Sequence, residues 1–324
     1  MRVFFQTKQS GLSLVELMVA MVLGLLLIGG VLQIFLSSKN TYITNLALSK
    51  VQESGRFAMD FLTFDTRNAS YRGECVGSLN NLPSPLNNDE RYILISGIKG
   101  WDNSEADSAL PSWFPASKRL PGTDMVLLKH AANSAGVTLA SAPTNDTITT
   151  TTATKLAFGT LLVIAEPVGC DIFQNQKTAT SLSISSSNEF RYAYSQKADL
   201  LKYQSSIYYI DNGSSNTPSL WRVRYDNPSD IVTEEIVEGI QNMQIKYAQG
   251  DSEGNITGDY LDANNITDWS SVVSVKITLL ATSNDSNVVS PNQVIRFNGQ
   301  DITINNGRLA QVFSTTVGIR NRLP

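Results

Sequence analysis

The chain has 324 residues and a formal net charge of −4, from 25 basic and 29 acidic side chains. Because it shows no basic patch, the composition argues against a nucleic-acid-binding protein. The length is sufficient for one large domain, or two small ones, with a hydrophobic core.

The first predicted element is a membrane-spanning helix. Residues 11–36 read GLSLVELMVAMVLGLLLIGGVLQIFL and contain Glu16 as their only charged side chain. From residue 17 to residue 36 a helix would be ~30 Å long, which is the thickness of one hydrocarbon core. The preceding leader carries Arg2 and Lys8 but no acid, the pattern that keeps an N-terminus in the cytoplasm.

The start of the apolar run differs from an ordinary secretory signal, because no A-x-A-like site follows the run. Instead Gly11 stands at the polar–apolar boundary, followed by Leu12 and, five residues after the glycine, by Glu16. This arrangement resembles the class III signal of type IV prepilins and pseudopilins. The resemblance implies cleavage between Gly11 and Leu12 by the prepilin peptidase, and N-methylation of the new amino group of Leu12.

Both polar features of this signal have a physical reason. Glycine has no side chain, so the backbone at Gly11 can enter a narrow catalytic cleft in an extended conformation. An acid in an apolar spanning helix costs ~2.5–3.5 kcal/mol near the bilayer centre and less toward the interface, so Glu16 needs a compensating partner. The resemblance implies that this partner is the N-terminal amine of a neighbouring subunit, which sets the register of assembly. The alternative is a plain signal anchor in which Glu16 lies at the headgroups without a role.

The helix is expected to continue beyond the membrane, because residues 37–70 contain no proline and only one glycine, Gly55. An apolar or small stripe recurs at spacings of three and four residues: Ile43, Ala47, Val51, Ser54, Ala58 and Leu62. A second set, Phe57, Phe61 and Phe64, broadens the apolar face where we expect the globular domain to cover it. The predicted divisions are a leader at 1–11, a transmembrane half at 12–36 and an amphipathic half at 37–72.

The end of this helix carries a second resemblance. Residues 54–75, SGRFAMDFLTFDTRNASYRGEC, resemble the PilW family of minor pilins, and so do the later blocks VEGIQNMQIKYAQGDSEGN, WSSVVSVKITLLATS and FSTTVGIRNRLP. We place the helix exit at Tyr71, Arg72, Gly73 and Cys75, with Gly73 as the helix stop because glycine readily adopts the left-handed conformation found there.

Residues 73–324 are predicted to form a mainly antiparallel β domain, in one sheet or two, packed on the second half of the helix. The fold class is therefore α+β and type IV pilin-like. Residues 76–121 are loop-rich with one strand at 92–98, and Trp101, Trp113 and Phe114 are expected to pin this loop onto the core; the alternative is an exposed recognition surface. The further predicted strands are 124–129, 156–165, 181–185, 206–210, 220–225, 239–247, 272–281 and 312–319.

Two cysteines occur, Cys75 and Cys170, both after the membrane helix. With the basic leader in the cytoplasm, the domain would face an oxidising periplasm, where two thiols commonly pair. We expect a disulfide between them. Two buried free thiols are the alternative, because separation in sequence does not say whether the side chains meet.

No catalytic set is visible. His130 is the only histidine and is interpreted as a strand-end residue rather than a base. Neither a phosphate-binding glycine loop, a C-x-x-C pair nor a G-x-S-x-G elbow occurs, so we expect no enzymatic activity and no cofactor.

An acid-rich turn is a weak calcium candidate, because hard oxygen ligands at alternate positions can surround Ca²⁺. Its members are Asp251, Glu253, Asn255 and Asp259, with Asp262 beyond them. The spacing departs from the EF-hand loop, and a solvated hairpin loop explains the turn equally well.

Together the resemblances imply a PilW-type minor pilin that primes type IV pilus assembly and lies at or near the pilus tip. It would cross the inner membrane once, with its C-terminal domain in the periplasm, and then enter the pilus at the cell surface. Expected partners are other minor pilins, the major pilin, the prepilin peptidase, the inner-membrane assembly platform and, as a candidate, a tip adhesin; nucleic acid is not expected. The alternatives are a J-like type II secretion pseudopilin and a signal-anchored periplasmic binding protein or enzyme.

Overall fold

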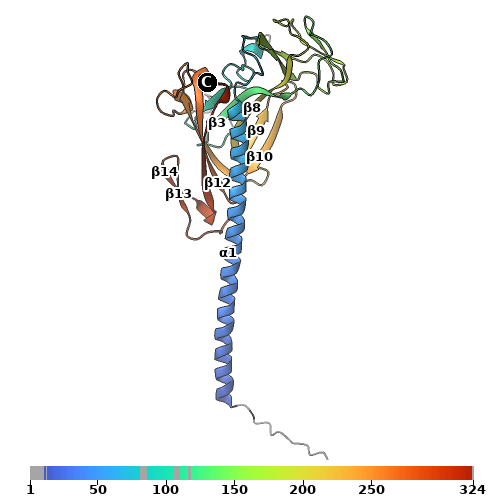
Figure 1. Cartoon of the computed structure of the whole chain (residues 1–324). Coiled ribbons are helices and arrows are strands. Elements are labelled where there is room, and N and C mark those ends of the chain that lie inside the picture. The colour runs from blue at the N-terminus through green and yellow to red at the C-terminus, as the bar shows by residue number, and fades with distance from the viewer. Residues whose placement is uncertain (1–10, 12, 81–85, 105–109, 116–117, 323–324) are drawn as a thin grey trace, which may run out of the picture.

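A computed structural model describes residues 11, 13–80, 86–104, 110–115 and 118–322. It consists of one long helix, α1 (Leu14–Asn68), and a β-rich head at the C-terminal end of that helix (Figure 1). The head is built from two main β-sheets. Among the described residues, the neighbouring strands within these sheets pair antiparallel, with one exception. The predicted α+β class, a long N-terminal helix on a mainly antiparallel β domain, is confirmed.

The strands have the following bounds in chain order: β1 (Leu79–Asn80), β2 (Ile98–Trp101), β3 (Met125–Ser134), β4 (Thr147–Thr149), β5 (Leu161–Glu166), β6 (Gly169–Gln174), β7 (Ser183–Ser185), β8 (Asp199–Asn212), β9 (Pro218–Arg224), β10 (Val232–Glu238), β11 (Ile240–Gln249), β12 (Val272–Thr282), β13 (Val294–Phe297), β14 (Gln300–Thr303) and β15 (Ala310–Gly318). Short 3₁₀ turns lie at Leu86–Asn88, Ala263–Asn265, Trp269–Ser271, Asn305–Gly307 and Arg320–Arg322.

The larger sheet has the order β1-β6-β5-β8-β3-β2, with β9 and β10 continuing from β8. Strand β8 is long enough to pair with β5 through residues 199–202 and with β9 through residues 206–212. The smaller sheet has the order β11-β12-β15, while β4–β7 and β13–β14 form separate two-stranded pairs. Strands β1 and β6 form the parallel pair.

The second half of α1 packs on both main sheets. Its buried residues recur at spacings of three and four: Ala47, Val51, Gly55, Ala58, Met59, Leu62, Asp65 and Thr66. Val51, Ala58 and Leu62 share one core with Tyr208 of β8 and Ile277 of β12. The predicted stripe is therefore confirmed from Ala47 onward, except that Gly55 is buried where the prediction has Ser54, and Ile43 is exposed.

The close approach of α1 to β15 explains why Gly55 occupies the stripe. A Cβ atom at this position would overlap with the ring of Phe313, so only glycine lets the two elements lie this close together. Further along, α1 ends at Asn68 rather than at residue 72, and Ser70 already adopts a left-handed conformation (φ +65°). The prediction that Gly73 stops the helix was wrong, although Gly73 is also left-handed (φ +72°) in the turn that follows.

Two predicted strands were also misplaced. Residues 91–96 form turns, and β2 begins only at Ile98. The prediction was misled because Tyr92 and Leu94, which are buried and anchor a turn, alternate with polar or exposed positions as in a strand. Likewise β5 begins at Leu161 rather than at residue 156, since Gly159 turns the chain with φ +86°.

Other strands are longer than predicted or were missed. Strands β3 and β8 extend beyond the predicted runs, and β6, β10 and the β13–β14 hairpin had no predicted counterpart. The aromatic residues of the long loop behave as expected. Trp101 and Phe114 are buried, and the Trp113 ring lies 6.0 Å from Trp101 and 5.4 Å from Tyr225, so the three side chains fasten the loop to the core.

Candidate assembly surface of the N-terminal helix

The first half of α1, residues 14–43, projects from the head and is called the stalk. The large apolar side chains of residues 14–36 are between 49% and 75% exposed. This part of α1 is long and apolar enough to cross a membrane. Burying such a surface in lipid or against other helices is strongly favourable, because each Å² of apolar area removed from water is worth about 25 cal/mol.

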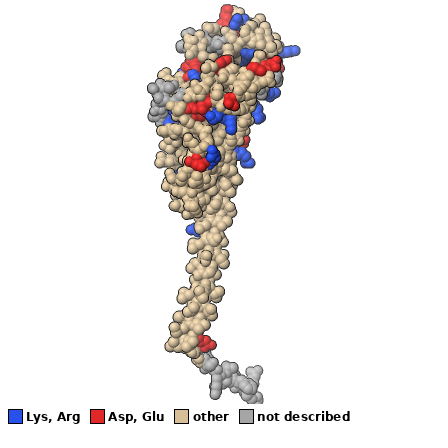
Figure 2. Space-filling view, turned by 90° about the vertical axis from the view of Figure 1, so that its left-hand side faces the viewer, with Lys and Arg blue, Asp and Glu red and all other residues tan. Residues whose placement is uncertain are grey.

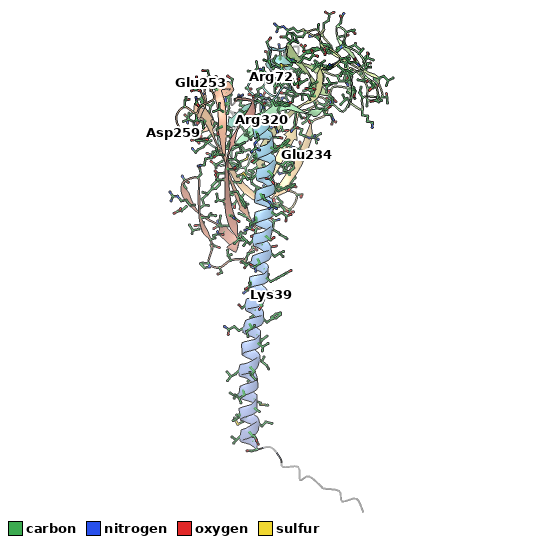
Figure 3. All side chains as sticks on the ribbon, viewed as in Figure 1. Lys39, Arg72, Glu234, Glu253, Asp259 and Arg320 are labelled. Carbon is green, nitrogen blue, oxygen red and sulfur yellow. A yellow bond between two sulfur atoms is a disulfide. The ribbon has the colours of Figure 1, made fainter. Side chains whose placement is uncertain are left out.

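Charge is almost absent from the stalk. Glu16 lies in its first turn and Lys39 near its end, with no charged residue between them. Figure 3 shows Lys39 on the helix below the head, and in Figure 2 the charged side chains gather on the head. Since the helix between these two charges is ~33 Å long, the stalk can cross a bilayer while the head stays in water.

The predicted processing site lies at the start of this surface. Gly11 is exposed, and an added Cβ there would meet nothing within 4 Å. Leu12 lies outside the described residues. Glu16 is exposed and has no hydrogen bond or ion pair among the described residues, and its position in the first turn suits the positive end of the helix dipole. The side chain is therefore free to meet a cation from another chain.

The prediction that the head covers Phe57, Phe61 and Phe64 was wrong for two of them. Phe57 is 51% and Phe64 62% exposed. Successive residues of a helix differ by ~100° in direction, so Phe57 points away from the stripe that contains Ala58. Phe61 is half-buried; its ring makes an edge contact with the Phe57 ring, with centroids 5.0 Å apart, and the Arg222 guanidinium lies over it, 5.7 Å from its centroid. Phe57 and Phe64 are therefore a separate exposed apolar pair on α1, beside the head.

A buried acid on the same helix was missed by the sequence prediction. Asp65 accepts a hydrogen bond from the Tyr208 hydroxyl (2.6 Å) and one from Gln204 Nε2 (3.2 Å), and lies 3.5 Å from His130 Nε2. Burial and the nearby Asp65 carboxylate raise the pKa of Tyr208 well above its usual value. Because this contact joins α1 to β3 and β8, it fixes the rotation of the helix on the larger sheet.

His130 belongs to this buried cluster. It lies within β3, not at its end as predicted, and is 2% exposed. Its Nδ1 atom lies 3.0 Å from the Ala131 carbonyl. A signal for this cluster was present in the sequence, because Asp65 continues the stripe of Ala58 and Leu62 at spacings of four and three.

The residue before it, Lys129, is fully buried and was also missed. Its Nζ atom donates to the Glu90 carbonyl (2.6 Å) and to Ser96 Oγ (3.0 Å). Burial lowers the pKa of Lys129 to about 7, more than the nearby Glu90 carboxylate can compensate. This lysine connects strand β3 to the loop that precedes its neighbour β2.

The two cysteines are joined in the structure. Cys75, seven residues after the end of α1, and Cys170 in β6 form a disulfide with their Cα atoms 5.6 Å apart. Because Cys75 follows the helix exit and Cys170 lies in β6, the bond fastens the helix exit to the larger sheet across 95 residues of sequence. Of the two alternatives that the sequence left open, the structure contains the paired one.

The acid-rich turn shows no metal-binding arrangement. Within the described residues no group of three or more histidine, cysteine, aspartate or glutamate side chains is placed to hold a metal ion. Asp251 instead accepts hydrogen bonds from the backbone amides of Asn255 and Glu253, both 2.9 Å long, and these bonds lower its pKa. Glu253 and Asp259 extend from the surface of the head (Figure 3), as in a solvated loop.

Comparison with known families agrees with this geometry. Residues 207–321 match the family described as type IV pilus-assembly protein W, and residues 6–32 match the prokaryotic N-terminal methylation motif. The two matches therefore cover part of the head and the start of the apolar helix. No curated protein and no solved structure matches it.

The PilW match covers a defined part of the head. It runs from the second half of β8 through β9 and β10, includes the whole smaller sheet and reaches the C-terminal 3₁₀ turn. These are the elements that supply most of the packing around the second half of α1. The family similarity therefore lies where the pilin-like helix joins the head, which supports a pilin-like role in type IV pilus assembly and membrane anchoring by α1.

Proposed function

We propose that this PilW-family chain is a minor pilin that takes part in priming type IV pilus assembly and lies at or near the pilus tip. It is cleaved between Gly11 and Leu12, and Leu12 is N-methylated. The observation that carries this proposal is the stalk, an exposed apolar half-helix whose first part lies within a methylation motif. An apolar surface of that size must be buried, first in the membrane and, after assembly, against other helices.

When the stalk moves from the lipid into contact with other helices, the hydrophobic effect contributes little. Helices associate in membranes through close packing and polar contacts, since lipid is as apolar as leucine. Glu16 supplies the polar contact by meeting the N-terminal amine of a neighbouring subunit. Phe57 and Phe64 then offer the neighbour an apolar contact above the membrane, beside the head.

The shape of the head supports a place near the tip. The yellow-green segment of the chain, which includes β4 to β7, lies at the end of the head farthest from the stalk (Figure 1). A subunit at the tip keeps that end uncovered. Its neighbours would be other minor pilins, the major pilin and a tip adhesin, and before assembly it would meet the prepilin peptidase and the assembly platform. In this state α1 crosses the inner membrane and the head lies in the periplasm.

Intact-mass analysis of the protein from native membranes, with and without the prepilin peptidase, tests the processing step. The expected mature chain begins at methylated Leu12, and the expected chain without the peptidase begins at Met1. A chain that still begins at Met1 in the presence of the peptidase would refute the pilin assignment and return the protein to the class of plain anchored domains.

The role of Glu16 is tested separately by Glu16→Ala. Cleavage should remain largely intact while surface piliation falls, because the register charge is removed but the scissile bond is not. Gln33→Ala, which removes the other strongly polar side chain of the apolar segment, is the matched control and should leave piliation unchanged. Loss of cleavage with normal piliation would contradict the assignment.

A deletion strain distinguishes the pilus from a secretion system. Surface pili should be reduced while secreted proteins remain at their normal level. Normal pili with reduced secretion would favour a type II pseudopilin instead.

A further inference from the structure

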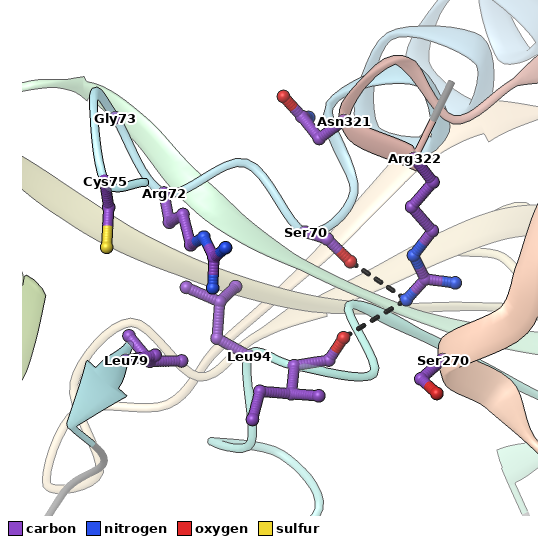
Figure 4. A pocket seen from close by; sticks show the side chains of 10 residues that line it. Ser70, Arg72, Gly73, Cys75, Leu79, Leu94, Ser270, Asn321 and Arg322 are labelled. Atoms are coloured by element: carbon purple, nitrogen blue, oxygen red, sulfur yellow. Dashed lines mark hydrogen bonds between the residues drawn. The ribbon is translucent and has the colours of Figure 1, made fainter. Parts of the chain in front are cut away.

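A cavity of about 390 Å³ lies at the junction between α1 and the head. Its walls come from five segments: the helix exit, strand β1, the turn before β2, the 3₁₀ turn before β12 and the C-terminal turn. Among its lining residues are Ser70, Arg72, Leu79, Leu94, Ser270 and Arg322 (Figure 4). The volume lies within the range of small-ligand sites.

Arg322 brings a buried positive charge to one side of this cavity. Its guanidinium donates to the carbonyls of Trp269 and Val272, both at 2.7 Å, to Ser70 Oγ at 2.9 Å and to the carbonyls of Ile95 and Ser96. All of these acceptors are neutral. The usual partner of a buried arginine is a carboxylate, and none is bonded to it among the described residues.

The lack of a direct counter-charge has an electrostatic consequence. Burial lowers the pKa of Arg322 to about 10, and Asp268 offsets this only in part. The Asp268 carboxylate is itself engaged by the Ser270 amide at 2.8 Å and the Ser270 hydroxyl at 2.6 Å. An anion entering the cavity would therefore relieve an unfavourable charge.

Arg72 supplies a second positive charge from the opposite wall. Figure 4 shows its guanidinium directed toward Leu94, across the cavity from Arg322. The Arg72 side chain is half-buried and makes no hydrogen bond or ion pair with any described residue. Among the described residues that line the cavity there is no aspartate or glutamate, so within this part of the chain the two arginines face no carboxylate side chain of the lining.

The floor between the arginines is apolar. Leu94 is almost completely buried and Leu79 is half-buried. Cys75 also lines the cavity, and its disulfide with Cys170 holds that wall to the larger sheet. A rigid cavity with two cationic sides and an apolar floor fits a carboxylate attached to an apolar group, because arginine forks bind carboxylates with two parallel hydrogen bonds.

We propose that this cavity binds a carboxylate of an acidic peptide, with Arg72 as the main ligand and Leu79 and Leu94 receiving the apolar neighbour of the carboxylate. The site is distinct from the stalk and does not depend on the proposed function. A partner protein with an exposed acidic segment would in this way dock on the junction between α1 and the head.

The test uses the full chain in detergent micelles at constant ionic strength, with thermal unfolding followed by tryptophan fluorescence. The probe is N-acetyl-leucine, which carries a carboxylate beside an apolar side chain, and its neutral match is N-acetyl-leucinamide. A ligand that binds only the folded state raises the unfolding temperature. We expect a saturable rise with N-acetyl-leucine and none with the amide.

Variants assign the site. Arg72→Gln should weaken the apparent affinity for N-acetyl-leucine at least about tenfold, the loss expected for one charge-assisted contact. Arg320→Gln is the matched control. It removes an exposed arginine that lies in the same C-terminal turn as Arg322 but does not line the cavity. That variant should bind like the unaltered chain.

Three results would overturn the proposal. Equal shifts with the acid and the amide would show that the carboxylate is not recognised. Unchanged affinity in Arg72→Gln would place any binding elsewhere. A shift with inorganic phosphate but not with N-acetyl-leucine would refute a peptide carboxylate as the ligand. The comparison of the two probes on the unaltered chain needs no variant, so a folding defect in Arg72→Gln cannot obscure the outcome.

Discussion

Gly55 offers the sharpest test of how α1 is seated on the head. It lies in the middle of a helix, where glycine costs about 1 kcal/mol relative to alanine. On an isolated helix, Gly55→Ala would therefore be stabilising. In this protein the Phe313 ring of β15 lies over the glycine, and we expect the sign of the effect to reverse.

The magnitude follows from the geometry. An added Cβ would lie no more than 2.5 Å from three carbon atoms of the Phe313 ring, whereas carbon atoms prefer a separation of about 3.5–4.0 Å. The ring or the helix must therefore move by about 1 Å. Overpacking of this kind typically costs ~1–3 kcal/mol, which equals or exceeds the gain in helix propensity.

A double-mutant cycle separates the two effects. The free energy of unfolding is measured by urea titration of the full chain in detergent, followed by tryptophan fluorescence, because all four tryptophans lie in the head. Gly55→Ala alone should be neutral or destabilising. In a Phe313→Ala background the same change should stabilise by up to ~1 kcal/mol, since only helix propensity remains.

The expected coupling between the two positions is thus ~1–3 kcal/mol. If Gly55→Ala stabilised the protein equally in both backgrounds, the ring would not be packed over the glycine. The account of why glycine stands in the stripe would then be wrong.

Three further predictions concern groups buried in the head. Asp65→Ala should lower the free energy of unfolding by about 3 kcal/mol, because it leaves buried donors without an acceptor, whereas Asp60→Ala on the exposed side of α1 should change it by less than ~0.5 kcal/mol in the same urea titration. The folded-state pKa of Lys129 is lowered to about 7, so below pH 7 the folded protein bears the full cost of burying its charge. This cost disappears as the pH rises toward the unfolded pKa near ~10.4, so the free energy of unfolding should rise over this window more steeply than in Lys129→Met. Equal slopes in the two proteins would contradict the burial of a charged lysine. Joint replacement of Cys75 and Cys170 by serine should lower stability by about 2–5 kcal/mol in non-reducing buffer, and an unchanged urea midpoint would show that the disulfide is not formed.

The parts of the fold with strong local patterns could be predicted from the sequence. An apolar run of sufficient length determines a membrane helix, and a repeat of three and four residues determines which side of its continuation is buried. The structure contains the long apolar helix, which is long and apolar enough to cross a membrane, and the buried stripe of Ala47, Val51, Ala58 and Leu62. The strands with clear alternation in the sequence, β11 and β12, were also placed to within two residues, although nine of the eleven residues of β12 are buried and so both of its sides are largely covered.

Local patterns did not determine how far the apolar face of α1 is covered. Phe57 and Phe64 are as hydrophobic as the stripe residues, yet the head stops short of them. The extent of cover depends on where β9 and β15 lie beside the helix, and that is a property of the assembled sheets. The same applies to Tyr92 and Leu94, which resemble a strand in sequence but anchor a turn.

The chemistry at the helix exit was decided by tertiary structure alone. Arg72 and Arg322 are 250 positions apart in the sequence, and neither is remarkable by residue type or spacing. They meet at one cavity because α1 ends where the C-terminal turn returns, with Asn321 donating to the Ala69 carbonyl. The sequence by itself determined the long apolar helix, its methylation motif and its buried stripe, since each is encoded by neighbouring residues. Only the folded head decided which charges face each other, because that depends on long-range packing.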